Sequence, residues 1–202
     1  QGTPPLQRIE QRSHHPGGMA MRSDVEPGDY APDFELPNAN SNVGGGSMAL
    51  SDVMGENGVV IVFTCNHCPY VVGSEPRIEA IAERARQGGL GFAGINANDP
   101  VDYDSDSWEH MIKRAEKGMT YSYLHDASQE VAAAYGAERT PEFYLMDSTG
   151  LVSYRGRMDD SPRDPSHATT SELADAIDEM LSGVGVTVPR TDSIGCSVKW
   201  KK

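Results

Sequence analysis

A short apolar segment followed at once by two cysteines constrains this chain more than any other feature. Residues Val59–Phe63 are β-branched or aromatic without interruption, as in a strand that is covered on both faces. Cys65 and Cys68 follow directly, and helical periodicity resumes after Ser74. The pattern predicts a buried strand that leads into a C-x-x-C pair at the start of a helix.

The rest of the chain alternates between strand and helix patterns. The helix after Ser74 is followed by a strand at 90–96, which gives a strand–helix–strand unit. Strands at 142–146 and 151–157 are joined by a short glycine-containing turn and predict an antiparallel hairpin. Further helices are expected at 106–117, 128–135 and 172–181, and a short strand at 121–124. We therefore expect an α/β fold with a central mixed sheet, helices on both faces and an antiparallel C-terminal hairpin.

The length and the apolar segments indicate how the chain is organised. Its 202 residues favour one domain, with 1–24 as a disordered N-terminal extension and 25–202 as the folded part. No apolar segment approaches the ~20 residues of a membrane span, and no secretory signal is visible. We therefore expect a cytoplasmic protein without a membrane partner.

The charge of the chain limits its partners. Asp and Glu number 30 against 17 Lys and Arg, which gives a net charge of −13. A negative field of this size repels phosphate backbones, so nucleic acid is not expected as a partner. The acidic residues within 99–106 are interpreted as a solvated loop. The same acidity is typical of halophilic proteins and also occurs in ordinary cytosolic ones.

The chemistry of the chain is expected at its cysteines. A cysteine at the start of a helix faces unpaired N–H groups and the positive end of the helix dipole, which favour the nucleophilic thiolate. We therefore expect Cys65 to begin the helix as the outer, attacking thiol, and Cys68 to be more buried and to resolve the mixed disulfide. A cationic His67 would stabilise the thiolate further, whereas a neutral one is a solvent-facing residue.

The other interpretations of the cysteines are metal binding and inert thiols. A structural zinc site needs a second pair of ligands, and the only further cysteine is Cys196. The sequence therefore favours redox chemistry for Cys65 and Cys68. Cys196 is either a third redox thiol or a lone buried thiol that behaves as a small apolar residue, and the sequence favours the second.

The order of these motifs resembles the thioredoxin fold: a strand, C-x-x-C, a helix, and a later Thr140–Pro141 before a hairpin. Segments 28–36, 65–70 and 193–200 are similar to the peroxiredoxin-like branch of that fold, which is related to the alkyl hydroperoxide reductase and thiol-specific antioxidant proteins. The resemblance implies that Pro141 is cis, packs against the cysteine pair and presents the backbone of Thr140 to substrate. Arg139 is expected either beside the site, where it would hold a thiolate or an anionic substrate, or at the surface.

Two departures limit what this resemblance implies. Typical peroxiredoxins carry a proline seven residues, and a threonine or serine three residues, before the cysteine that reduces peroxide. This chain has Gly58 and Val62 at those distances before Cys65. Thioredoxin carries a buried aspartate six residues before its first cysteine, and this chain has Val59 there.

The sequence therefore predicts a thiol-dependent oxidoreductase. The favoured activity is thiol–disulfide exchange through Cys65 and Cys68 in cell redox homeostasis. The alternative is a thiol peroxidase that reduces hydroperoxides, and a third hypothesis is a metal-binding thiol module. The expected partners are a disulfide-containing protein or a small thiol substrate and an upstream thiol reductant, with no cofactor and no metal.

Overall fold

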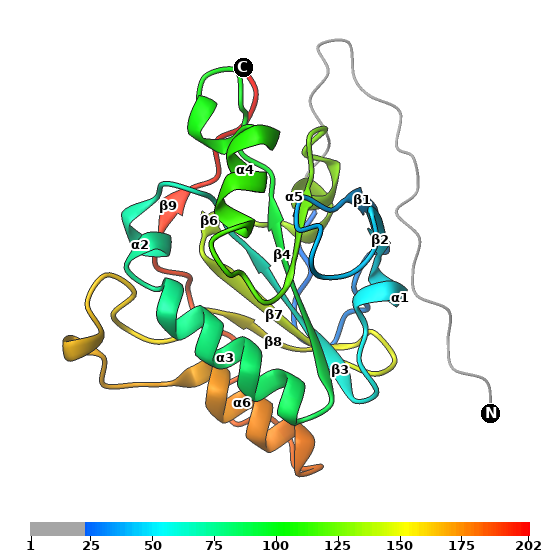
Figure 1. Ribbon diagram of the computed structural model, residues 1–202. Coiled ribbons are helices and arrows are strands. Elements are labelled where there is room, and N and C mark those ends of the chain that lie inside the picture. Colours follow the sequence, from blue (N-terminus) through cyan, green and yellow to red (C-terminus); the bar gives the residue numbers. More distant parts are fainter. Residues whose placement is uncertain (1–22) are drawn as a thin grey trace.

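The computed structural model describes residues 23–202 (Figure 1). Residues 1–22 of the expected N-terminal extension lie outside the described residues, so that expectation stays a prediction. The described chain begins with Ser23, whose N–H donates to the carbonyl oxygen of Ala133 at 2.8 Å. Within the described part, no helix has both the length and the apolar character needed to cross a bilayer.

The centre of the fold is a mixed sheet of five strands. Their spatial order is β5 (Ser122–His125), β4 (Leu90–Asn96), β3 (Gly58–Phe63), β7 (Glu142–Asp147) and β8 (Val152–Gly156). The β4–β5 pair is parallel, whereas β3–β7 and β7–β8 are antiparallel. The β7–β8 pair is the expected hairpin, so the predicted mixed sheet is confirmed.

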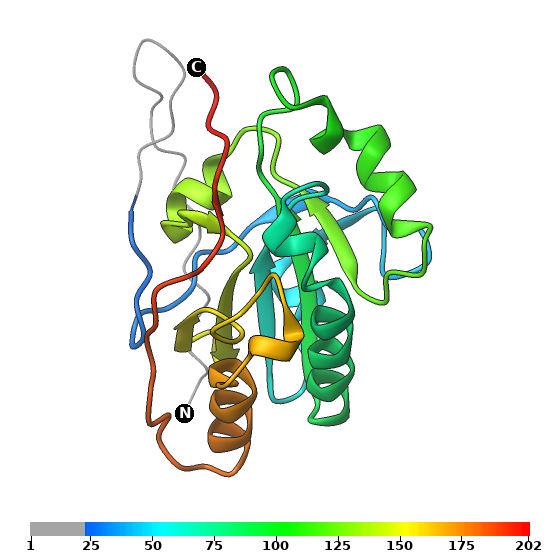
Figure 2. The ribbon, with the colours of Figure 1, turned by 90° about the vertical axis from the view of Figure 1, so that its left-hand side faces the viewer.

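The alternation of side chains along β3 divides the core into two layers. Val59, Ile61 and Phe63 pack on the side of α5 (Glu130–Tyr135). Val60 and Val62 pack on the opposite side, against α3 (Glu75–Gln87) and α6 (Glu172–Leu181). Figures 1 and 2 show α3 and α6 side by side on one face of the sheet. Both faces are thus covered, which explains why the β3 sequence is apolar throughout.

Shorter elements complete the two layers. The side of α5 also holds β1 (Glu35–Pro37), β2 (Ser47–Ala49) and α1 (Leu50–Val53). The other side holds α4 (Trp108–Ala115), which follows the 3-10 helix η1 (Asp104–Asp106); a second 3-10 helix, η2 (Pro165–His167), precedes α6. The helix expected at 106–117 starts later because Ser107 is its N-cap and accepts the N–H of His110.

The segment after the first two cysteines forms two helices in place of one. A single turn, α2 (Pro69–Val72), comes first, and α3 begins after its N-cap Ser74, as the sequence predicted. The Ser74 hydroxyl is hydrogen-bonded to the carbonyl oxygens of Tyr70 at 2.7 Å and Pro162 at 2.6 Å. These contacts hold the start of α3 beside the loop before η2.

The last part of the chain returns to the sheet as an extended segment, here called the C-terminal strap (residues 193–202). It contains β9 (Cys196–Ser197), which pairs antiparallel with β6 (Arg139–Thr140). Beyond β9, the Val198 N–H donates to the carbonyl oxygen of Glu138 at 2.9 Å. The carbonyl oxygen of Lys199 accepts the N–H of Asp99 at 2.8 Å. Figure 2 shows this red segment running along one side of the molecule. At one end of the sheet, the strap therefore contacts residues that are far from it in the sequence, namely Asp99 and 138–140.

Candidate thiol active site

Three cysteines from separate parts of the chain lie together at this end of the sheet. Cys65 follows β3, Cys68 precedes α2 and Cys196 begins β9. With Val71 and Tyr70 they form a small cluster apart from the two main core layers, and all three thiols are free. The interpretation of Cys196 as a lone buried thiol is therefore wrong, because the β6–β9 pairing brings it to the other two.

The order of the first two cysteines differs from the expected one. The helix begins at Pro69, so that Cys68, and not Cys65, is its N-cap. The Cys65 side chain is 0% exposed and that of Cys68 is 3% exposed. The expectation that Cys65 begins the helix as the outer thiol is therefore wrong. The backbone turn at Asn66 and His67 lies between the strand and the helix, and it leaves Cys65 on the core side.

The surroundings of Cys68 favour its thiolate. The Cys65 thiol beside the Cys68 sulfur lowers the pKa of Cys68 well below its usual range. The Cys196 thiol and the N–H groups of Cys196 and Tyr70 lower this pKa further. The Cys68 sulfur, together with burial, raises the pKa of Cys65. The reduced site therefore favours a thiolate on Cys68 over one on Cys65.

Thr140 contacts both cysteines of the pair. Its hydroxyl oxygen lies 3.5 Å from the Cys65 sulfur, and its carbonyl oxygen lies 3.7 Å from the Cys68 sulfur. The Thr140–Pro141 peptide bond is cis, as the resemblance implied. The Thr140 hydroxyl lowers the pKa of Cys65 and so opposes the effect of burial. This hydroxyl is placed to stabilise Cys65 when that sulfur carries charge.

His67 faces away from the cysteines, toward the segment before α4. Its Nδ1 lies 2.8 Å from the Ser105 hydroxyl and 3.0 Å from Asp106 Oδ2. The ring stacks on Tyr103 with 6.2 Å between the centroids. These contacts make His67 a residue that ties the C-x-x-C loop to η1.

Asp106 is a site residue that sequence reasoning missed. It is fully buried, although the acidic cluster at 99–106 was interpreted as solvated. Its Oδ1 accepts the Asn66 N–H at 2.7 Å, and its carboxylate also accepts the side-chain amides of Asn96 at 3.1 Å and Asn98 at 3.0 Å. Because it fixes the backbone between the two cysteines, Asp106 positions the pair. The alternation of Asn and Asp after a buried strand was the signal available in the sequence.

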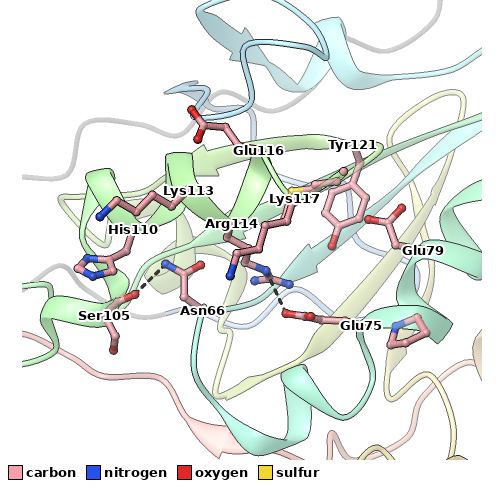
Figure 3. A pocket seen from close by; sticks show the side chains of 13 residues that line it. Asn66, Glu75, Glu79, Ser105, His110, Lys113, Arg114, Glu116, Lys117 and Tyr121 are labelled. Atoms are coloured by element: carbon pink, nitrogen blue, oxygen red, sulfur yellow. Dashed lines mark hydrogen bonds and ion pairs between the residues drawn. The ribbon is translucent and has the colours of Figure 1, made fainter.

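Arg114, also missed, holds the same loop from α4. Its guanidinium donates to the carbonyl oxygen of Cys65 and to the Tyr123 hydroxyl, the latter at 3.2 Å, and its Nε lies 3.3 Å from Glu75. Figure 3 shows Arg114 beside Asn66 at the wall of a hollow of about 770 Å³ between α3 and α4. The described lining of that hollow mixes lysines with glutamates and contains neither Cys65 nor Cys68. It is therefore adjacent to the thiol site and separate from it.

Arg139 lies at the surface of the site. It is exposed, and its guanidinium donates to the carbonyl oxygen of Gly195 at 3.1 Å. This contact attaches the C-terminal strap to β6. Arg139 is thus exposed and also beside the site, since its charge lowers the pKa of Cys196.

Comparison with known proteins identifies the family. Residues 27–155 match the model of the family described as the AhpC/TSA family. The chain belongs to the AhpC/TSA family. Membership of this family identifies the chain as a thiol-dependent oxidoreductase, as the sequence predicted.

Individual relatives of this AhpC/TSA protein agree with the assignment. A crystal structure of an uncharacterized conserved protein from Geobacillus kaustophilus has a TM-score of 0.79 at 39% identity, covering 87% of this chain and 92% of that chain. A Mycobacterium tuberculosis protein described as a "putative peroxiredoxin" is 29% identical over 137 residues, covering 66% of this chain and 78% of the relative. A "putative thiol:disulfide interchange protein" from Chlorobium tepidum has a TM-score of 0.56 at 19% identity, covering 79% of this chain and 98% of that chain, and shares the fold alone. The thioredoxin-like fold expected from the sequence is confirmed.

The metal-binding hypothesis has a direct geometric test. Within residues 23–202, no three His, Cys, Asp or Glu side chains are grouped so that they could hold a metal ion. His67, the third ligand that this hypothesis needs, contacts Ser105 and Asp106 instead. The arrangement of the three sulfurs is suited to disulfide exchange.

Proposed function

We propose that this protein is a thiol–disulfide oxidoreductase in which Cys68 attacks and Cys65 resolves. The observation that carries the proposal is the clustering of Cys65 and Cys196 around Cys68, where their thiols and the N–H groups of Cys196 and Tyr70 lower the pKa of Cys68. These donors favour a thiolate at neutral pH, and the thiolate is the attacking species.

The exchange proceeds in two balanced steps. The Cys68 thiolate attacks one sulfur of the substrate disulfide, and the other sulfur leaves as a thiolate that takes up a proton. Cys65 then loses its proton and attacks the Cys68 sulfur, which forms the Cys65–Cys68 disulfide and releases the second substrate sulfur as a thiol. The substrate disulfide is reduced by two electrons and the cysteine pair is oxidised by two. The Thr140 hydroxyl, 3.5 Å from the Cys65 sulfur, supports Cys65 in the second step.

Reduction of hydroperoxides is the weaker candidate for this site. Typical peroxiredoxins hold a hydroxyl three residues before the peroxide-reducing cysteine. That position is Cys65 when counted from Cys68, and Val62, which is fully buried in the core layer of α3 and α6, when counted from Cys65. Family membership supports peroxide chemistry in general, whereas the surroundings of Cys68 support disulfide exchange. The partners that follow are a protein or small-molecule disulfide and an upstream thiol reductant, in a cytoplasmic setting that keeps thiols reduced.

Trapping experiments test the proposal with glutathione disulfide as the substrate. In Cys65→Ser/Cys196→Ser, Cys68 is expected to accumulate as a stable mixed disulfide with glutathione, detected by mass spectrometry. In Cys68→Ser, the buried Cys65 is expected to react at least about tenfold more slowly. A faster mixed disulfide at Cys65 would reverse the order of attack. Absence of a mixed disulfide in both variants, together with rapid oxidation of the wild type by hydrogen peroxide, would replace the proposal with a peroxidase.

A further inference from the structure

Cys196 has contacts that the two-cysteine reaction does not use. It packs against the cluster of Cys65 and Cys68, and it lies opposite Thr140, whose carbonyl oxygen is 3.7 Å from the Cys68 sulfur. The Cys196 thiol and N–H also lower the pKa of Cys68. Cys196 is more exposed than the other two cysteines, because it is half-buried whereas Cys65 and Cys68 are buried. Cys68 is therefore the central sulfur of three, with the buried Cys65 and the more accessible Cys196 both in contact with it.

The position of Cys196 is fixed by the C-terminal strap. Cys196 is the register partner of Thr140 in the β6–β9 pair. Gly195 permits this approach, because a Cβ atom there would lie 2.1 Å from the carbonyl oxygen of Thr140. On the far side, the Lys199 N–H donates to Asn98 Oδ1 at 2.8 Å. Held at both ends, the strap keeps the third thiol at the pair.

We propose that Cys196 is a relay thiol that passes the disulfide from the buried Cys65–Cys68 pair to the surface, where an external thiol reductant attacks it. The proposal rests on the proposed function, because the Cys65–Cys68 disulfide is the product of that reaction. Cys196 attacks the Cys68 sulfur, which forms a Cys68–Cys196 disulfide and releases Cys65, and the Cys196 proton passes to Cys65. No electrons leave the protein in this step.

Reduction of the Cys68–Cys196 disulfide is expected to begin with attack at the Cys196 sulfur. A thiolate of an external dithiol attacks the Cys196 sulfur and expels Cys68, and the second thiol of the dithiol releases Cys196. The sulfur with the lower pKa leaves faster, and the Cys65 thiol together with the N–H groups of Cys196 and Tyr70 makes Cys68 that sulfur. Cys196 is the most exposed of the three cysteines, so an incoming thiol reaches it first, and a hollow of about 350 Å³ lined by Tyr70, Arg139 and Gly195 lies beside the strap next to it in sequence. Attack at the fully buried Cys65 has no comparable opening.

The reactivity of Cys196 depends on the state of the pair. In the reduced site, burial and the Cys68 sulfur raise the pKa of Cys196 to about 11, so that Cys196 stays protonated. When Cys68 is bonded to Cys65, it no longer holds the charge that raises this pKa. The positive charges of Lys199 and Arg139 remain and lower it. Cys196 thus becomes a better nucleophile once the pair is oxidised.

Disulfide mapping tests the relay. The reduced protein is treated with one equivalent of glutathione disulfide, quenched with acid, alkylated and digested. In Cys65→Ser, and in Cys65→Ala as a second variant, a Cys68–Cys196 disulfide is expected to form. Persistence of glutathione on Cys68 in both folded variants, with no Cys68–Cys196 peptide, would overturn the relay.

The rate of re-reduction gives the second readout. Oxidised Cys196→Ser is expected to be reduced by dithiothreitol at least about tenfold more slowly than the wild type, because the reductant must attack the buried pair directly. Ser197→Ala is the matched control, since Ser197 is the exposed neighbour in β9 and its hydroxyl contacts only Lys199 in the described structure. Equal rates in Cys196→Ser and the wild type would overturn the relay. Loss of the Cys65–Cys68 disulfide in Cys196→Ser would instead contradict the proposed function.

Discussion

Thr140 and Cys196 are opposite each other in the β6–β9 pair, and each of them contacts Cys68. The strand before the cis proline and the C-terminal strap therefore meet at one sulfur. The strap is thus part of the site, and substitutions in the strap should change the reactivity of Cys68 and Cys196. The following predictions are based on this arrangement and on the groups that support it.

Gly195→Ala should separate β9 from β6. The added Cβ would lie 2.1 Å from the Thr140 carbonyl oxygen, a backbone atom that cannot move freely, so Cys196 should withdraw from Cys68. We expect formation of the Cys68–Cys196 disulfide in the Cys65→Ser background to slow at least about tenfold. Gly185→Ala is the control, because a Cβ there meets nothing within 4 Å. Equal rates in the two variants would show that the β6–β9 pairing does not position Cys196.

The pH dependence of Cys68 should respond to its neighbour Cys65. The Cys65 thiol is the first of several groups that lower the pKa of Cys68 well below its usual range, so alkylation of Cys68 by iodoacetamide should level off below neutrality. In Cys65→Ala the midpoint of this profile should move upward, because the largest stabilising donor is gone. In Cys65→Ser the midpoint should lie between those of the wild type and Cys65→Ala, since serine keeps an O–H donor. Identical profiles for all three proteins would contradict the effect of Cys65 on the pKa of Cys68.

Asp106→Ala should destabilise the protein and loosen the loop between the cysteines. The substitution leaves the Asn66 N–H and the amides of Asn96 and Asn98 without their acceptor in a buried site. We expect a loss of about 2–5 kcal/mol in the free energy of unfolding, measured with urea, and faster alkylation of Cys65. Asp104→Ala is the control because that side chain is 87% exposed, and it should change stability by less than about 1 kcal/mol.

Arg155→Ala should be among the most destabilising single changes. Arg155 is fully buried, and its Nε lies 3.2 Å from Glu142, which is itself 2% exposed in its side chain. Removing the guanidinium leaves a buried carboxylate unpaired next to Pro141, at a cost of about 3–5 kcal/mol. Arg157→Ala removes a more exposed partner of Glu172 and should cost about 1 kcal/mol. Urea unfolding of both variants makes the comparison, and similar losses would contradict the role of burial.

The parts of the fold that could be predicted are those with a local signal. The apolar β3, the helix after Ser74, the hairpin and the Thr140–Pro141 motif each appear within a few consecutive residues. The start of the helix at Cys65 was mispredicted, because it depends on one detail, the residue at which α2 begins. Propensities place such a boundary only to within a residue or two.

The parts that could not be predicted depend on contacts between distant segments. Asp106 was expected to be solvated because a short acidic cluster gives no sign that Asn66, Asn96 and Asn98 surround one of its members. Cys196 was expected to be alone because nothing near it in the sequence indicates pairing with Thr140. Such residues are recognised only when the tertiary structure brings their partners together.

The place of the strap in the chain has a consequence for biosynthesis. All five strands of the central sheet and α6 precede residues 193–202, so they leave the ribosome before the strap does. A nascent chain at that stage already carries Cys65 and Cys68, whereas β9 and Cys196 are still missing. The pair therefore meets cellular oxidants first as a simple dithiol, and a chain that stalls late in translation would carry a site able to become oxidised without its route back to the reduced state.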